Sequence, residues 1–330
     1  MNDPGADIRD RNGLPFPLSA LAELWPLDGW REVVRVPGGR NEHLRVTTGD
    51  GVYFLRRSYR SKSLDELTPQ LLLMRLLRLR GLPVPVPVSN TEGLQWAEVE
   101  GRLWVMTRAL SGSPYDGSPG HLRALGLTMA HYHHTVADLP GGNVEPRPLV
   151  ELRERVAGLE AGSALTERAE QVVEELSALS PELPRLIVHG GARGSSLLFA
   201  GDEVVGILAF DNAHPDVRVL DLAVAVQDVG KGSLSPGVDD QSGDLDLDRV
   251  ADLLSAYCET GYLTLTEAAA LPLMIEATRL RGALSRIPRQ REGEPLSVSD
   301  RARIDRERSR LRWLDDHRRD LELICAARAR

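Results

Sequence analysis

Residues 187–224 read IVHGGARGSSLLFAGDEVVGILAFDNAHPDVRVLDLAV, and this stretch decides the fold of the chain. Its short apolar runs predict two strands, at 197–199 and 204–210. The triplet His189-Gly190-Gly191 precedes the first strand, and Ser196 follows five residues after Gly191. The second strand ends in the triplet Leu208-Ala209-Phe210. These two triplets and Ser196 form the candidate site.

The stretch resembles the catalytic segment of the aminoglycoside phosphotransferase and choline kinase family. In that family the first triplet is His-Gly-Asp, an Asn follows five residues later, and an Ile-Asp-Phe-like triplet ends the next strand. The family hallmark Asp221-Leu222-Ala223 anchors the alignment here. The resemblance covers about residues 30–285. It implies an α+β, bilobal, protein-kinase-like fold with a small five-stranded N-lobe and a larger helical C-lobe.

The resemblance also implies that the chemistry of this site has been lost. The family's proton-accepting Asp corresponds to Gly191, and its magnesium-holding Asn and Asp correspond to Ser196 and Ala209. A general base needs a carboxylate within hydrogen-bond reach of the nucleophile. Magnesium prefers hard oxygen ligands in a near-octahedral shell. We therefore predict no catalytic residue and no metal site, with Asp211 as an alternative metal ligand.

Two further family positions lie in the predicted small lobe. The strand at 52–56 ends in Arg56, where the resemblance implies a phosphate-binding lysine. The helix at 65–80 carries Gln70, where it implies the glutamate partner of that lysine. Arg and Gln can hydrogen-bond, but they do not form the Lys–Glu ion pair.

The retained scaffold predicts a binding cleft between the lobes. Its predicted lining is Arg56, Gln70, Arg193, Ser196, Asp211 and the Asp-rich loop after Lys231. We expect His189 and Asp221 to be structural, because they hold the catalytic loop in the family. The histidines at 131, 133 and 134 are expected to pack in a helix, since no Glu-rich metal-binding pattern accompanies them.

The chain divides into an N-terminal extension at 1–29, a nucleotide-type N-lobe at 30–108, a hinge or linker at 109–120, and a helical C-lobe at 121–330. The degenerate segment 187–224 lies in the C-lobe. A Gly-Asp-Gly turn at 49–51 predicts a hairpin, and apolar residues at helical spacing predict the helices. Strands are predicted at 33–36, 43–47, 52–56, 94–99 and 103–108. Helices are predicted at 19–25, 65–80, 120–136, 149–159, 166–179, 249–262, 264–286 and 297–328.

Composition excludes several classes of function. A net charge of -8 over 330 residues argues against nucleic-acid binding. No apolar run approaches the roughly 20 residues of a membrane span, and the N-terminus lacks the basic start and apolar core of a secretory signal. Cys258 and Cys325 are too few for a disulfide framework. We expect a cytoplasmic protein without membrane contact.

We accordingly predict a catalytically inactive pseudokinase, a binding or scaffold protein and not an enzyme. Its partner is expected to be a peptide, a small molecule or a pathway enzyme in the cleft, and the acidic balance suits a cationic or neutral ligand. By analogy, it could present a precursor peptide in a peptide-modifying biosynthetic pathway. No cofactor is expected: ATP binding stays open but is predicted to be independent of magnesium.

Two alternatives remain open. The first is an active small-molecule or peptide kinase, an ATP-dependent O-phosphotransferase that uses Arg56, Ser196 and Asp211 in atypical roles. The second is a structural subunit with no ligand. The sequence does not fix the oligomeric state.

Overall fold

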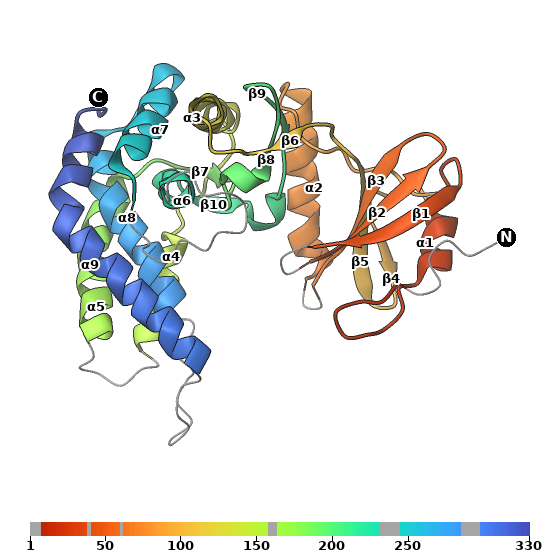
Figure 1. Cartoon of the computed structure of the whole chain (residues 1–330), viewed down its shortest axis with the longest axis horizontal. Coiled ribbons are helices and arrows are strands. Elements are labelled where there is room, and N and C mark those ends of the chain that lie inside the picture. The colour runs from red at the N-terminus through yellow and green to blue at the C-terminus, as the bar shows by residue number, and fades with distance from the viewer. Residues whose placement is uncertain (1–7, 38–40, 60–61, 158–163, 231–244, 285–297) are drawn as a thin grey trace. The chain divides into compact units, whose positions relative to one another are not determined.

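The computed structural model describes residues 8–37, 41–59, 62–157, 164–230, 245–284 and 298–330. They belong to two compact units (Figure 1). The sheet unit comprises Met1–Gly112 with Val205–Leu208, and the helical unit comprises Ser113–Val204 with Ala209–Arg330. Each unit has its own set of buried apolar side chains.

The sheet unit is built on a five-stranded antiparallel sheet with the strand order β1-β2-β3-β5-β4. The strands are β1 (Trp30–Val36), β2 (Glu42–Thr48), β3 (Val52–Arg57), β4 (Ala97–Val99) and β5 (Arg102–Arg108). Asp50 closes the predicted hairpin, because its carboxylate accepts hydrogen bonds from the hydroxyls of Thr48 and Tyr53 at 2.6 and 2.7 Å. The predicted small β-rich lobe is confirmed.

One helix packs on each face of this sheet. Residues of β5 alternate between the two faces, as successive strand residues do. Helix α1 (Leu18–Leu24) and the segment around it bury Leu21 and Trp25 in the cluster that contains Trp104. On the other face, Leu67 and Leu71 of α2 (Leu64–Leu79) pack with Leu103 and Val105. A capping box of Ser63 and Glu66 begins α2.

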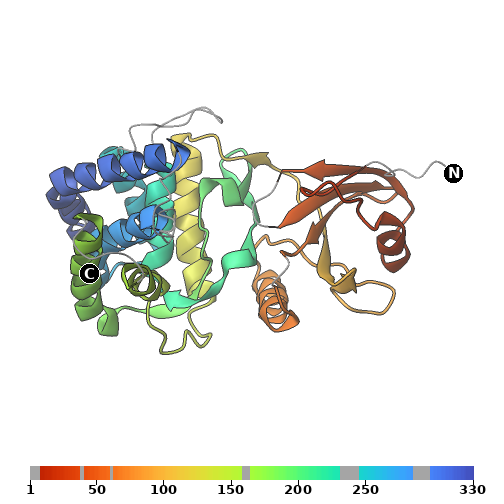
Figure 2. The same cartoon turned by 90° about the horizontal axis from the view of Figure 1, so that it is seen from below.

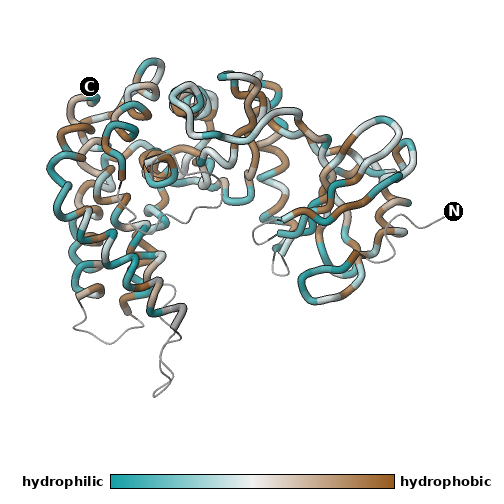
Figure 3. Tube along the Cα trace, viewed as in Figure 1, coloured by the Kyte–Doolittle hydropathy of each residue, from teal (hydrophilic) through white to brown (hydrophobic). Residues whose placement is uncertain are grey.

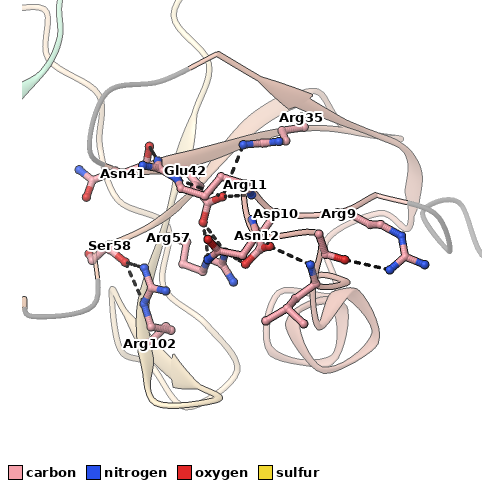
Figure 4. Close-up of polar contacts among 12 residues, drawn as sticks. Arg9, Asp10, Arg11, Asn12, Arg35, Asn41, Glu42, Arg57, Ser58 and Arg102 are labelled. Carbon is pink, nitrogen blue, oxygen red and sulfur yellow. Dashed lines mark hydrogen bonds and ion pairs between the residues drawn. The ribbon is translucent and has the colours of Figure 1, made fainter. Parts of the chain in front are cut away.

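A buried ionic cluster of Asp10, Glu42 and Arg57 ties the N-terminal segment to the sheet (Figure 4). Arg57, the last residue of β3, donates hydrogen bonds to Asp10 at 2.7 Å and to Glu42 at 2.9 Å. Burial tends to raise the pKa of Asp10, but hydrogen bonds from Arg57 and from main-chain N–H groups lower it to about 2. The guanidinium also lies over the rings of Phe16 and Trp104. The sequence pattern does not predict this cluster.

The described helices of the helical unit are α3 (Pro119–Thr135), α4 (Arg147–Val156), α5 (Ala164–Leu179), α6 (Val219–Val229), α7 (Leu247–Thr260), α8 (Leu265–Leu284) and α9 (Val298–Ala326). Helix α8 lies at the centre and packs against α4, α5, α6 and α9 (Figures 1 and 2). Helix α3 packs against α7. The predicted larger helical lobe is therefore confirmed.

Short strands carry the candidate site. β7 (Arg185–Val188) pairs antiparallel with β10 (His214–Val217), a pairing that the sequence pattern does not predict. β6 (Ser113–Pro114) pairs with β8 (Leu197–Ala200), and β9 (Glu203–Ile207) follows. The predicted strand at 204–210 is too long, since β9 ends at Ile207 and Phe210–Asn212 forms a 3₁₀ turn. Ala209 is left-handed (φ 65°), a conformation through which a strand cannot continue.

Hydropathy separates the helices of this unit. Helix α6 is mostly apolar and buried, whereas α9 is largely hydrophilic (Figure 3). Within the described parts of the chain, no helix is long and apolar enough to cross a membrane. Residues 231–244 of the predicted Asp-rich loop lie outside the described residues.

Candidate active site

Asp221, in the first turn of α6, holds the loop that follows β7. Its side chain is fully buried, and its two carboxylate oxygens accept hydrogen bonds from the N–H groups of His189 and Gly190 at 2.7 and 2.8 Å. The ring Nε2 of His133 lies 3.3 Å from one of these oxygens. Burial alone would raise the pKa of Asp221, but the contact with His133, the nearby histidine rings and the main-chain donor hold it below its ordinary value.

Gly190 allows the loop to turn back on itself. Its φ is +70°, which favours glycine. A Cβ at this position would also lie 2.2 Å from the main-chain oxygen of Asn212, so any side chain would force the loop apart. The neighbouring His189 ring is buried against Phe210, with 4.8 Å between ring centroids. The sequence Phe210–Asn212 thus packs directly against the loop.

Gly191, unlike Gly190, has room for a side chain. A Cβ there would lie 3.7 Å from Nδ1 of His189 and 3.9 Å from Nδ2 of Asn212, which are ordinary contact distances. Its φ is not in the left-handed region. The position that the resemblance assigns to the catalytic carboxylate is therefore sterically open, and nothing in the backbone demands glycine.

Ser196 closes the loop. It is buried, and its hydroxyl donates a hydrogen bond to the main-chain oxygen of Gly191 at 2.9 Å. Asp228 of α6 accepts from the N–H of Gly194 at 2.9 Å and lies 3.8 Å from the guanidinium of Arg193. The Arg193 side chain is 52% exposed. The structure therefore joins the predicted residues Gly191 and Ser196 directly, whereas Arg193 pairs with a carboxylate that the sequence analysis did not include.

Ala209 keeps a strained backbone at the end of β9. Its φ of 65° and ψ of 45° are left-handed, a conformation that costs roughly 1–2 kcal/mol for a residue with a Cβ. Asp211 is half-buried in the 3₁₀ turn that follows. Among the described residues, no group of three His, Cys, Asp or Glu side chains is arranged to hold a metal ion.

The two predicted small-lobe residues lie in the sheet unit. Arg56 is paired with Val105 in the β3–β5 register, so its side chain leaves the sheet on the face that α2 covers. Gln70 of α2 is buried. Arg56 and Gln70 therefore occupy the same side of this sheet.

Sequence reasoning missed the contacts of His133, Tyr257 and Asp228. His133 was expected only to pack, but its ring joins Asp221 on one side and the Tyr257 hydroxyl, at 3.0 Å, on the other. The three residues come from α3, α6 and α7. No local spacing signals a contact between helices so far apart in the chain.

Together, the five-stranded sheet unit, the helical unit and the carboxylate-anchored loop after β7 define a protein-kinase-like fold. The family model described as "Phosphotransferase enzyme family" matches residues 32–257. The chain belongs to this family.

Relatives and solved structures agree with this assignment. The chain is 30% identical over 299 residues to homoserine kinase of Methylobacillus glycogenes, covering 87% of this chain and 88% of that protein. It is 30% identical over 273 residues to homoserine kinase of Methylobacillus flagellatus, with 81% of each chain covered. Amicoumacin kinase hAmiN in complex with AMP-PNP, Ca²⁺ and Ami has the same fold, with a TM-score of 0.72, 15% identity and coverage of 91% and 92%. The microcompartment-associated aminopropanol kinase has a TM-score of 0.71, 16% identity and coverage of 92% and 97%.

These findings correct five predictions from the sequence. The predictions of a scaffold pseudokinase and of a non-enzyme are wrong, because relatives that the chain matches over more than four-fifths of their length are homoserine kinases. The peptide-binding role in a biosynthetic pathway is overturned by the same relatives. The absence of a cofactor and the independence from magnesium are contradicted by the kinase relatives and by the nucleotide and Ca²⁺ in the amicoumacin kinase complex. The error arose because the absence of the family's Asp, Asn and Asp at positions 191, 196 and 209 was taken as evidence that the activity is lost.

Proposed function

We propose that this protein is an ATP-dependent O-phosphotransferase that phosphorylates a hydroxyl group of a small molecule. The homoserine kinases to which it is similar over more than four-fifths of its length support a hydroxy amino acid such as homoserine as the acceptor. A cytoplasmic location fits an enzyme that consumes ATP and carries two free cysteines.

The observation that carries the proposal is the strained backbone of Ala209 next to the loop that Asp221 holds. Gly190 and Ala209 both adopt positive φ, and the buried carboxylate of Asp221 binds two main-chain N–H groups. Strained backbone persists where the surrounding structure enforces it, and it clusters at functional sites. The left-handed Ala209, next to the loop that Asp221 holds, therefore supports a functional site here.

Phosphoryl transfer does not depend on a side-chain base alone. Catalysis comes mostly from positioning and from stabilisation of charge on the transferred group. General-base catalysis typically contributes about 10²–10⁴-fold, so glycine at 191 lowers the rate without removing the reaction. Arg193, two residues further along the same loop, supplies a positive charge that can face the phosphoryl oxygens.

A divalent cation fits this site only in part. Ala209 offers no ligand, and the Ser196 hydroxyl is engaged with the Gly191 carbonyl. Asp211 supplies a carboxylate on the neighbouring turn, and magnesium often binds through one or two carboxylates with substrate phosphates and water completing its shell. Asp211 is thus the residue that would hold the cation, which when bound offsets the negative charge of the phosphates.

The test measures ADP release and phosphorylated product from ATP and L-homoserine, with and without magnesium. We expect magnesium-dependent turnover. Asp211→Asn should weaken activation by magnesium about tenfold or more, because it removes the charged ligand. The matched control, Asp252→Asn on the exposed side of α7, should leave magnesium activation unchanged. Absence of product with homoserine and with a panel of other small alcohols would overturn the proposal.

A second variant probes the open position in the loop. Gly191→Asp should fold, because a Cβ has space there. It should raise kcat, by up to about 10²-fold. A stable Gly191→Asp protein with unchanged or lower kcat would show that the wild-type site uses another proton acceptor.

A further inference from the structure

A histidine in β10 contacts the turn that carries Asp211. His214 is the first residue of β10, which pairs with β7 (Figure 1). Its ring Nδ1 lies 2.6 Å from the main-chain oxygen of Asn212, and its Nε2 lies 3.0 Å from a carboxylate oxygen of Asp216. His214 and Asp216 share one face of the strand, since residues two apart point the same way. The histidine therefore connects the turn Phe210–Asn212 to the strand that follows it.

Both ring nitrogens of His214 face hydrogen-bond acceptors. The carbonyl oxygen of Asn212 can only accept. Asp216 is fully buried, and its two oxygens already accept from the N–H groups of Val217 at 2.6 Å and Arg147 at 3.0 Å, so it is an acceptor toward His214 as well. A neutral imidazole has one N–H and one lone pair, so either tautomer would turn a lone pair toward an acceptor. The imidazolium is the form that donates at both nitrogens.

The surroundings of the ring favour this protonated form. Burial tends to lower the pKa of His214, but the hydrogen bonds to Asp216 and to the main-chain oxygen of Asn212 raise it above its ordinary value, as does the charge of Asp216. The side chain is 23% exposed. The ring can therefore exchange its proton with water.

Two elements supply the main charges that face the ring. Asp216, on β10 itself, favours the proton, and Arg147 at the start of α4 opposes it. The guanidinium of Arg147 pairs with Glu151 at 2.7 Å. β7, the partner strand, places the uncharged Val188 opposite His214. The balance of these charges depends on the protonation of His214.

The main-chain oxygen of Asn212 is a close contact of the site. A Cβ at Gly190 would lie 2.2 Å from this oxygen, so the turn and the loop pack tightly here. The turn begins at the left-handed Ala209, and the N–H of Ala213 closes it by donating to the oxygen of Phe210 at 3.1 Å. Strained backbone persists where the surrounding structure enforces it. A donor fixed on the Asn212 oxygen supplies part of that enforcement.

We propose that His214 is a positioning residue, which in its imidazolium form holds the turn with Asp211 against the loop that carries Gly191. The inference rests on the proposed phosphotransferase function, because this turn and this loop form the proposed site. The hold on the turn is complete below about pH 6.5, the ordinary pKa of histidine. Because folding raises the pKa of His214, the hold is lost as the pH rises through the folded-state value. Turnover should fall over the same range.

The first experiment follows the ring itself and needs no turnover. NMR of the full chain, labelled with ¹³C and ¹⁵N so that each imidazole is assigned through its bonds, records the titration of His214 between pH 5 and pH 9. We expect both ring nitrogens to stay protonated above about pH 6.5. His134, on the exposed side of α3, is the comparison and should titrate at a lower pH than His214. A ring of His214 that loses its proton at or below about pH 6.5 would overturn the proposal.

The second experiment measures turnover of ATP and L-homoserine over the same pH range. His214→Gln keeps an amide donor for one acceptor only, so kcat at about pH 6 should fall about tenfold or more, with little change in KM for ATP. The wild type should approach the kcat of this variant as the pH rises, and the variant should lack that step. The matched control, His134→Gln, should keep the wild-type profile. An unchanged kcat in His214→Gln would contradict the positioning role.

The outcomes separate this inference from the proposed activity. If no alcohol yields product, the proposed function fails, and the hold on the turn is then measured by hydrogen exchange of the Ala213 amide. Protection of that amide that falls with rising pH in the wild type, and is low at every pH in His214→Gln, sustains the role of His214. Equal protection in both proteins overturns it.

Discussion

The sheet unit and the helical unit each bury a polar cluster built on carboxylates, two in the first and one in the second, and the two clusters offset this charge by different means. In the sheet unit, the guanidinium of Arg57 lies between Asp10 and Glu42. In the helical unit, Asp221 is met by two main-chain N–H groups and by His133. The first cluster joins side chains that are distant in sequence. The second shapes the backbone of a loop.

This difference separates a structural charge from a charge that builds a site. A buried ion pair fixes side chains in place, and removal of one partner leaves the other as an unpaired charge in a low-dielectric environment. A carboxylate that accepts from successive N–H groups fixes φ and ψ of the loop itself. The loop around Gly191 therefore keeps its form without a charged residue at positions 191 or 209, which is why altered residue types there do not imply a lost site.

Removal of the guanidinium should have the largest effect on stability. Arg57→Met leaves Asp10 and Glu42 buried without their shared cation, so we expect the free energy of unfolding to fall by about 3–5 kcal/mol. Urea unfolding measures the loss. The control is Arg45→Met, whose exposed pair with Glu32 should contribute only about 0–1 kcal/mol. Similar losses for both variants would contradict the structural role of the buried cluster.

Asp221→Asn tests the loop cluster and should cost less, about 2–3 kcal/mol. The amide retains one oxygen for one N–H group but turns its own NH₂ toward the other donor. Thermal unfolding, together with hydrogen exchange of the His189 and Gly190 amides, should detect the loosened loop. Asp228→Asn is the comparison, because Asp228 is 21% exposed and accepts one main-chain N–H. If Asp228→Asn loosens the loop as much, Asp221 is not its anchor.

The sheet-unit cluster should also respond to acid. The pKa of Asp10 falls from 3.8 to about 2 on folding, so the unfolded chain takes up this proton first. The contribution of Asp10 is then complete above about pH 4 and is lost as the pH falls toward about 2. Between about pH 5 and about pH 3, the free energy of unfolding in urea should fall more steeply for the wild type than for Asp10→Asn. The difference between the two slopes should correspond to the uptake of at most one proton. Equal slopes would mean that Asp10 does not titrate with folding.

The smallest expected effect concerns the strained turn after β9. Ala209→Gly relieves the left-handed conformation and should raise the free energy of unfolding by about 0.5–1 kcal/mol. Ala213→Gly, at the other end of the same turn with an ordinary φ of -64°, should lower it by about 0.5–1 kcal/mol. If denaturation curves show that the free energy of unfolding rises in Ala209→Gly and falls in Ala213→Gly, the strain at Ala209 is established. A lower free energy of unfolding in both variants would rule it out.

The local pattern of the chain determined most of its elements and its family. Apolar residues at helical spacing gave α2 and the long helices, and the Gly-Asp-Gly turn gave the β2–β3 hairpin. The two triplets and the Asp221 hallmark led to the phosphotransferase family, which the family model confirms. These signals are short-range, so they survive in a single sequence. The same residue types, taken alone, led to the wrong conclusion that the protein is not an enzyme.

Tertiary structure alone decided which charges meet. Arg57 donates a hydrogen bond to Asp10, which lies 47 positions away in the sequence. His133 contacts Asp221, which lies 88 positions away. Arg279 of α8 likewise donates a hydrogen bond to the main-chain oxygen of Arg310 on α9. The left-handed Ala209 and the space beside Gly191 are likewise set by packing around Phe210 and Asn212. Contacts between distant segments depend on how helices and strands pack, and for that reason they leave no periodic trace in the chain.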